Sequence, residues 1–411
     1  MALADHSQPT WSITPEQGQQ LNSVAFDAPG RNIFTGTSQE YGKTSVDVFC
    51  YNTDGKSATL SWSQTIATDV DSGTFWVAMS PTGNYCAAAG HTASDNGYIY
   101  IYDVVTGDTV GSFTSFTSRV NEIEFTGLGD QFIAVQGSNV ILGKNTAGVF
   151  NQETTSPSAQ AYMRTCSTST NDTWAVAAGG IDGSGGAPST GIICMYENVN
   201  GTFQYRNMAT TTNEILRIAM IDDGQYFVAT DNAGNVFLFS TASPTPLWSY
   251  TPAYSCDLTY AAAVAYNSNQ EVMVAVGTNI SVTSTVQSEA SKAFQVQPGL
   301  IYVLKNVVDS SQPSGYASAV QWQQRIEYPP NPGLNFDAQA KYVTCATGQP
   351  YDTLNETTGS FYLFDGATGF QYWRYDTSIM NWPMQINAEA TACIGGSDNG
   401  TLYYWGLPVQ S

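Results

Sequence analysis

A short apolar strand, a turn and a second strand ending near Gly recur along this chain about every 40 to 50 residues. The recurrence reads SVAF, DAPG and NIFTG from Ser23, then WVAM, SPTG and YCAAAG from Trp76, then RIAM, IDDG and YFVATD from Arg217. The apolar runs alternate with a period of two or are wholly apolar, and Gly, Pro, Asn and Asp bound them. The pattern predicts an all-β chain with four strands per repeat, which is typical of β-propeller blades.

The repeats also predict how the ring closes. The units align on one strand position each, at Val24, Val77, Ile123, Arg164, Ile218, Val264, Leu334 and Met384. The last unit, at 380–408, has only three strands, whereas the strand TWSIT at about 10–14 precedes the first unit. Pairing these two segments leaves no exposed half-blade edge. We therefore predict a single domain, 1–411, forming an eight-bladed β-propeller of four-stranded antiparallel blades closed by the N-terminal strand. Seven blades are the alternative if the weak unit from Arg164 is not a blade.

One repeat carries a more specific motif. The segment GSFYLFDGATGFQYWRY from Gly359 contains the pattern Asp365, Thr368, Gly369 and Trp373, which resembles the tryptophan-docking repeat of quinoprotein-like eight-bladed propellers. The segments SPTGNYCAAAG and GNVFLFSTASPTPLWSYT are also similar to WD-like and quinoprotein-like repeats of archaeal and bacterial surface proteins. The resemblance implies a structural role, in which the Trp packs between neighbouring blades.

The same resemblance does not extend to the cofactor. Quinoprotein dehydrogenases hold pyrroloquinoline quinone beside an adjacent Cys-Cys pair, and this chain has no adjacent cysteines, so that cofactor is not expected. No metal site is predicted, although the stretch DNAGN at Asp231 leaves calcium open because it supplies carboxylate and amide oxygens without the full 12-residue loop.

Charge narrows the range of partners. The chain has 13 Lys and Arg against 34 Asp and Glu, a formal net charge of -21. Such a surface repels nucleic acid and anionic membranes, and no apolar stretch predicts membrane insertion. The abundance of Ser, Thr, Asn, Gln and Gly is common in exported proteins, so we expect an extracellular or cell-envelope location. A cytoplasmic location is the alternative, because Met1–Thr14 lacks the apolar core of a signal peptide.

Candidate binding residues lie where each inner strand begins. The position before each aligned residue is occupied by Ser23, Trp76, Glu122, Met163, Arg217, Ala263, Gly333 and Pro383. This mixed column is expected at the mouth of a central channel, and from it and its surroundings we select Trp76, Glu122, Arg217 and Trp382 as binding residues. The longest insertions, which start at Ser38, His91, Gly179, Thr278 and Gly348, all fall between the second and third strands of a blade. They decorate one face, the looped face, and loops on a rigid scaffold often carry function.

Catalytic groups are scarce. The only histidines, His6 and His91, cannot supply a histidine-based triad or a multi-histidine metal site. The pair Asp222 and Asp223 lies in a strand turn, where Asp bonds to nearby backbone. We therefore expect a non-enzymatic binding scaffold that presents its looped face to a protein or glycan partner. The alternatives are a carboxylate-based polysaccharide hydrolase or lyase, which needs two converging carboxylates, and a structural surface or assembly component.

Overall fold

The computed structural model describes residues 7–15, 19–38, 45–68, 72–93, 96–155, 157, 161–181, 189–256, 259–281, 298–348 and 358–408. Within these ranges the chain forms 32 β-strands, in sheets whose neighbouring strands are antiparallel. No helix long and apolar enough to cross a membrane occurs in the described part of the chain.

The strands group into eight four-stranded blades. From the inner to the outer strand, blade 1 contains β2 (Gln20–Phe26), β3 (Asn32–Ser38), β4 (Val46–Thr53) and β5 (Ala58–Ala67), and blade 2 contains β6 (Gly73–Met79), β7 (Tyr85–His91), β8 (Gly97–Asp103) and β9 (Thr109–Phe113). Blade 3 contains β10 (Val120–Phe125), β11 (Gln131–Gln136), β12 (Asn139–Thr146) and β13 (Val149–Thr155), and blade 4 contains β14 (Ala161–Thr168), β15 (Trp174–Ile181), β16 (Thr190–Asn198) and β17 (Phe203–Thr211). In the same order, blade 5 contains β18 (Ile215–Met220), β19 (Tyr226–Asp231), β20 (Val236–Ser240) and β21 (Pro246–Tyr250), and blade 6 contains β22 (Ala261–Tyr266), β23 (Val272–Asn279), β24 (Gly299–Val308) and β25 (Tyr316–Ile326). Blade 7 contains β26 (Pro330–Phe336), β27 (Tyr342–Gly348), β28 (Gly359–Asp365) and β29 (Gln371–Thr377), and blade 8 contains β30 (Asn381–Ile386), β31 (Ala392–Ser397), β32 (Leu402–Gly406) and β1 (Trp11–Ile13).

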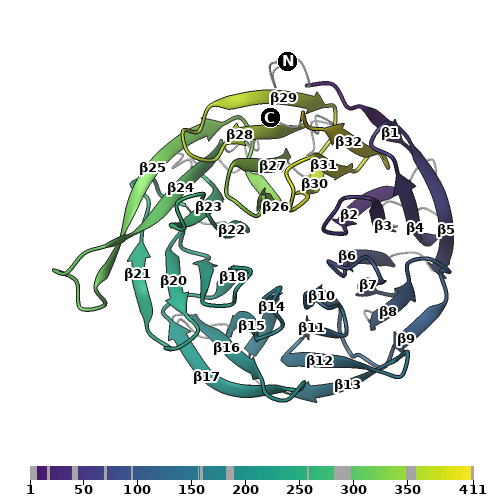
Figure 1. Ribbon diagram of the computed structural model, residues 1–411, viewed down its shortest axis with the longest axis horizontal. Helices are drawn as coiled ribbons and strands as arrows, with labels where there is room; N and C mark the ends of the chain where they lie inside the picture. Colours follow the sequence, from purple (N-terminus) through teal and green to yellow (C-terminus); the bar gives the residue numbers. More distant parts are fainter. Residues whose placement is uncertain are drawn as a thin grey trace, which may run out of the picture.

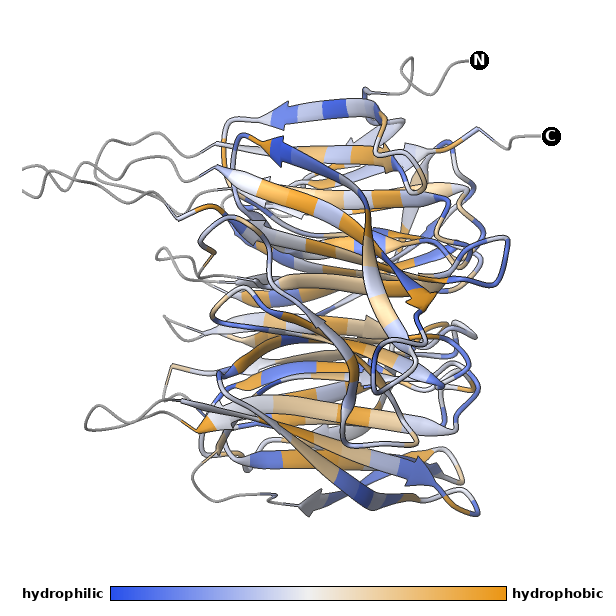
Figure 2. Ribbon diagram, turned by 90° about the vertical axis from the view of Figure 1, so that its left-hand side faces the viewer, coloured by the Kyte–Doolittle hydropathy of each residue, from blue (hydrophilic) through white to orange (hydrophobic). Residues whose placement is uncertain are grey.

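The blades stand in a ring around a central channel. The first strand of each unit lies nearest the axis and the fourth on the rim, with the purple N-terminal strand beside the yellow C-terminal ones (Figure 1). Seen from the side, apolar and polar positions alternate along many strands of the disc (Figure 2). The weak fourth unit forms the sheet β14 to β17, so the described strands make eight blades.

The N-terminal strand closes the ring as predicted. Strand β1 pairs with β32 in the register Trp11 to Tyr404 and Ile13 to Leu402. The rings of Trp11 and Tyr404 stack with centroids 4.7 Å apart. Because β32 would otherwise present an open edge, this pairing completes blade 8 with residues from the other end of the sequence.

Tryptophans join neighbouring blades. Trp373 of blade 7 stacks on Trp405 of blade 8 with ring centroids 5.2 Å apart. Trp322 of blade 6 lies against Gly369 in the turn of blade 7, and its Nε1 donates to the Gly366 carbonyl oxygen at 2.9 Å. In that turn Asp365 accepts hydrogen bonds from the backbone and the hydroxyl of Thr368, both at 2.8 Å. The motif therefore both receives a Trp from the preceding blade and supplies one to the next.

The seven cysteines belong to the interior. All are buried and none forms a disulfide. Burial raises the pKa of the Cys345 and Cys393 thiols well above the ordinary value, which keeps them protonated and unreactive. The thiols act as small apolar groups in the interior, including Cys256, which lies in the connection between β21 and β22.

Candidate functional site in the central channel

The inner strands raise a hydrogen-bonding problem. Each pairs with the second strand of its own blade, and β6 also pairs at one residue, Gly73, with Ser38 of β3, which joins blades 1 and 2 into one sheet. Most of the other edge of each inner strand therefore presents unpaired backbone groups to the channel. Polar side chains of neighbouring blades satisfy part of this edge. Ser23 Oγ accepts the Val77 N–H at 2.9 Å. Thr165 Oγ1 accepts the Ile218 N–H at 3.2 Å, so both side chains link one blade to the next.

A second tier of the same contacts lies two residues further along. Ser167 Oγ accepts the Met220 N–H at 3.1 Å, and Gln385 Oε1 accepts the Phe26 N–H at 3.2 Å across the closure between blades 8 and 1. Much of the polarity that the sequence places at the channel therefore holds blades together.

Trp76, Glu122 and Arg217 converge from blades 2, 3 and 5. The Glu122 side chain is only 1% exposed; its Oε1 lies 2.8 Å from Arg217 Nη2 and its Oε2 accepts the Cys166 N–H at 3.1 Å. The Arg217 guanidinium carbon lies 4.5 Å from the ring centroid of Trp76. Because blades 2 and 5 are three positions apart, Arg217 reaches across the channel. Burial raises the pKa of the Glu122 carboxyl, and the charge of Arg217 acts in the opposite direction.

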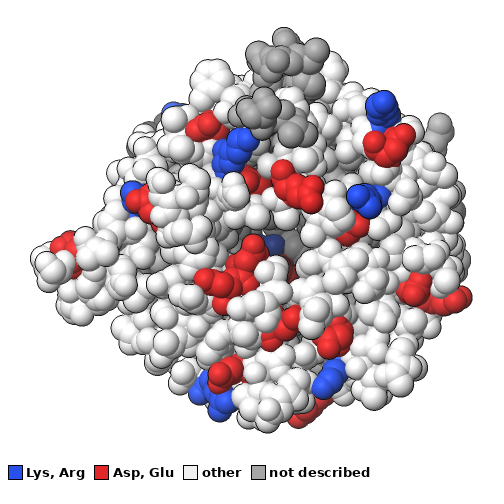
Figure 3. Space-filling model, in the orientation of Figure 1, with Lys and Arg blue, Asp and Glu red and all other residues white. Residues whose placement is uncertain are grey.

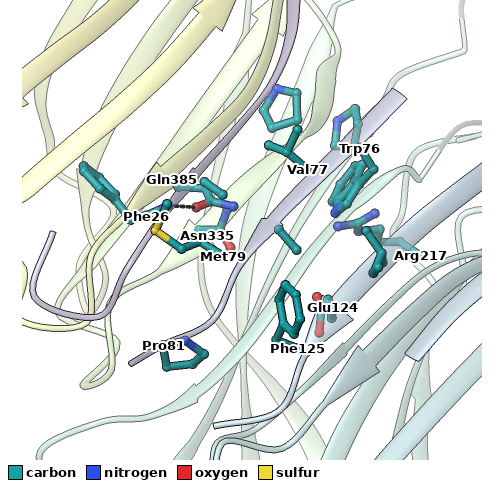
Figure 4. A pocket seen from close by; sticks show the side chains of 15 residues that line it. Phe26, Trp76, Val77, Met79, Pro81, Glu124, Phe125, Arg217, Asn335 and Gln385 are labelled. Carbon is teal, nitrogen blue, oxygen red and sulfur yellow. Dashed lines mark hydrogen bonds between the residues drawn. The ribbon is translucent and has the colours of Figure 1, made fainter. Parts of the chain in front are cut away.

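A cavity of about 180 Å³ lies beside this cluster. Trp76 and Arg217 lie near the middle of β6 and β18, and the cavity continues towards Phe26, Met79 and Phe125, the last residues of β2, β6 and β10 (Figure 4). Six of the eight inner strands contribute to its lining, so the cavity exists only when the ring is assembled.

Glu124 is the cavity residue that sequence reasoning missed. It lies two residues after Glu122, so both carboxyl groups project from the same face of β10. Its Oε2 accepts the Thr168 N–H at 3.0 Å. Burial and the nearby Glu122 charge raise the pKa of Glu124 to about 7, while Arg217, Thr168 and Ser167 oppose the rise. The signal in the sequence is the pattern VNEIEF, which places two glutamates on one face of an otherwise apolar strand.

Trp382 lies beside the predicted column, and Met163 belongs to it. Trp382 donates its Nε1 hydrogen to Asp398 Oδ1, and no contact in the described structure joins it to the Arg217 cluster, although its neighbour Pro383 lines the cavity. Met163 is fully buried in the core and does not hold the position expected of it. A β-bulge directly precedes the column residue in β2, β6, β10 and β18, and the bulge of β14 directly precedes Thr165. Thr165 therefore occupies the equivalent place, and the predicted alignment of this weak unit is two residues too early.

The predicted insertions connect the second and third strands of blades 1, 2, 4, 6 and 7. Most of their residues, 39–44, 94–95, 182–188, 282–297 and 349–357, lie outside the described ranges. The turns that follow the inner strands are described, and they form the opposite face. These turns hold eight acidic residues against two basic ones: Asp27, Asp130, Asp172, Asp222, Asp223, Glu271, Asp337 and Glu389 against Arg31 and Lys341. Acidic side chains surround the hollow at the centre of the ring in Figure 3.

Candidate metal ligands have protein partners. Asp231 is buried; its Oδ1 accepts the Ala233 and Asn235 N–H groups at 2.9 and 2.8 Å, and its Oδ2 accepts the Asn213 and Asn235 amide groups at 3.0 and 2.7 Å. Asp223 likewise accepts the Gln225 N–H at 2.9 Å, as expected of a turn residue. No group of three or more His, Cys, Asp or Glu arranged to hold a metal ion occurs within the described ranges.

The fold has a solved counterpart. The β-propeller domain of Cps50 (Swd1) from Myceliophteria thermophila matches with a TM-score of 0.53 and 11% sequence identity, over 98% of this chain and 99% of that one. The chain folds as a β-propeller. At this identity the likeness concerns the fold alone. No protein-family model and no curated protein matches the chain, and the finer resemblance to quinoprotein-like repeats stays a prediction.

Proposed function

We propose that the protein is a non-enzymatic binding scaffold that presents its looped face to a partner, first a protein and alternatively a glycan, outside the cell or at the cell envelope. The observation that supports a scaffold is how the polar side chains of the inner strands are used. Ser23, Glu122 and Thr165 hydrogen-bond to the backbone of the next blade instead of standing ready for a substrate. A ring held together in this way is a rigid support for surface loops.

The test removes loops from one face and compares them with a matched removal from the other. Residues 282–297, between β23 and β24, are replaced by a short Gly-Ser linker; the control shortens the turn between β24 and β25 in the same blade. Immobilised variants are exposed to extract from the native source, and bound proteins and glycans are quantified. We expect the first change to abolish capture of a specific partner and the second to preserve it. Equal capture by both variants would argue against the looped face.

A carboxylate-based hydrolase is a second candidate, because Glu122 and Glu124 are neighbours on one strand and the pKa of Glu124 is raised to about 7. A carboxyl group protonated near neutral pH suits a general acid in glycoside hydrolysis. Polysaccharides are incubated with the protein and with the Glu124→Gln variant, and new reducing ends are measured. Activity that disappears in the variant would favour this candidate over the scaffold.

A further inference from the structure

The cavity in the channel carries an unbalanced charge. Glu122 and Arg217 form an ion pair 2.8 Å apart and neutralise each other. Glu124 is the remaining ionisable residue of the lining, so its ionised form gives the cavity one net negative charge. At about 30 Å³ per water molecule, the cavity of about 180 Å³ has room for about six waters or a small organic group.

The hydrogen-bond acceptors of the cavity favour an ammonium group over a guanidinium group. Thr168 and Ser167 already hydrogen-bond to the Glu124 carboxylate, so only part of its acceptor capacity is left for a ligand. An ammonium group is a compact charge that needs one acceptor at a time, whereas a guanidinium binds best to a carboxylate with both oxygens available. On another wall, Asn335 donates its Nδ2 hydrogen to the Met384 carbonyl oxygen at 2.9 Å, which leaves the amide oxygen as an acceptor.

The other walls suit an apolar stem. Met79, Phe125, Phe26 and Pro81 are among the residues that line the cavity. These side chains lie towards the face on which the turns that follow the inner strands hold eight acidic residues against two basic ones. Such a face raises the local concentration of cations at the channel mouth.

We propose that the channel cavity binds a primary ammonium group on a short apolar stem, with Glu124 as the counter-charge and Met79 and Phe125 against the stem. A free aliphatic amine and a lysine side chain of a partner protein share this chemistry. The site opens away from the looped face, so the inference does not rest on the proposed function.

Binding should depend on pH because the cation favours the ionised carboxylate. The ionisable groups around Glu124 are Glu122 on the same strand, Arg217 from blade 5 and Cys166 from blade 4. With the pKa of Glu124 near 7, most molecules carry a neutral carboxyl at pH 6 and an ionised one at pH 8. An aliphatic amine remains protonated at both values, so we expect affinity about tenfold higher at pH 8 than at pH 6.

The experiment uses the full chain and n-butylammonium as the probe, with saturation transfer from protein to the butyl protons measured by NMR during titration. The neutral alcohol 1-butanol has the same stem and tests the role of the charge. We expect saturable binding of the amine and at least about tenfold weaker binding of the alcohol. Equal binding of the two, or no binding of the amine, overturns the proposal.

Two variants locate the site. Glu124→Gln keeps an acceptor for the Thr168 N–H and should weaken amine binding at least about tenfold and remove its pH dependence. Glu153→Gln removes an exposed glutamate on the rim strand β13 and should leave binding unchanged. Circular dichroism and the melting temperature verify that both variants are folded. Unchanged binding in Glu124→Gln overturns the proposal.

A second ligand distinguishes the two sources. A short peptide with one central lysine is compared with the same peptide carrying norleucine. Tighter binding of the lysine peptide than of n-butylammonium assigns the cavity to a partner's side chain. Binding of the amine without binding of the peptide assigns it to a small free ligand. Both results support the ammonium site.

Discussion

The ion pair across the channel gives the sharpest prediction. Changing Arg217 to Met keeps an apolar contact with Trp76 but leaves Glu122, whose side chain is 1% exposed, without its cation. Removing one partner of a buried pair costs about 3–5 kcal/mol. At about 2.1 cal/mol/K of unfolding entropy per residue, a chain of 411 residues should lose about 3–6 °C of melting temperature.

The loss should also depend on pH. Burial raises the folded-state pKa of Glu122, and removing Arg217 raises it further because the guanidinium charge lowers it. A carboxyl whose folded-state pKa is raised contributes its stability below the unfolded-state pKa, about 4.3, and loses it as pH rises through the folded-state value. The gap between variant and wild type should therefore be small at pH 5 and largest at pH 8.

Differential scanning calorimetry at pH 5 and pH 8 provides the measurement. The double variant Glu122→Gln with Arg217→Met removes both charges and keeps an acceptor for the Cys166 N–H, so it should recover most of the lost stability. A pH-independent gap, or a double variant as unstable as Arg217→Met alone, would refute the electrostatic account and leave packing as the cause.

Three further changes test the closure, the docking turn and the cavity. Deleting residues 1–15 removes β1 and should lower the melting temperature by about 2–5 °C; an unchanged value would contradict closure by this strand. In urea unfolding, Gly369→Ala should destabilise the protein by about 1–3 kcal/mol more than the control Gly148→Ala. Both glycines have a positive φ, but a Cβ at Gly369 would lie 2.6 Å from the Trp322 ring, whereas a Cβ at Gly148 would meet nothing within 4 Å. Glu124→Gln should be as stable as wild type near pH 4 and about 2–3 kcal/mol more stable at pH 8. With a folded-state pKa of about 7 for Glu124, the stability of wild type falls as pH rises from about 4.5 to 7. Equal urea midpoints of the two proteins at pH 8 would contradict this.

The Glu124 prediction connects stability with function. A carboxyl group that is costly to ionise in the folded protein is retained at the wall of a cavity, where a cation would offset that cost. Functional sites often lower the stability of the folded protein, because binding or chemistry needs a group that is unfavourable there. Glu124→Gln therefore separates stability from binding, because it should gain stability at pH 8 while losing affinity for an amine.

The blades and their closure could be predicted from the sequence because they depend on local information. The period-two alternation, the turn residues after each strand and the recurrence of the unit specify strands, and the unpaired strand at 10–14 matches the missing one at the C-terminus. The motif around Asp365 is also local, since its turn hydrogen bonds join residues three positions apart.

Only the tertiary structure decided the site. Trp76, Glu122 and Arg217 shared a predicted column, but their contacts depend on the length of Arg217 across the channel and on which blades face each other. Thr165, and not Met163, takes the place in β14 that Glu122 and Arg217 take in their strands, because each of them directly follows the β-bulge of its inner strand and the hydrophobic pattern does not mark where a strand bulges. Glu124 became a site residue only through its burial beside Glu122, since desolvation is a property of the assembled ring and not of a residue's neighbours in sequence.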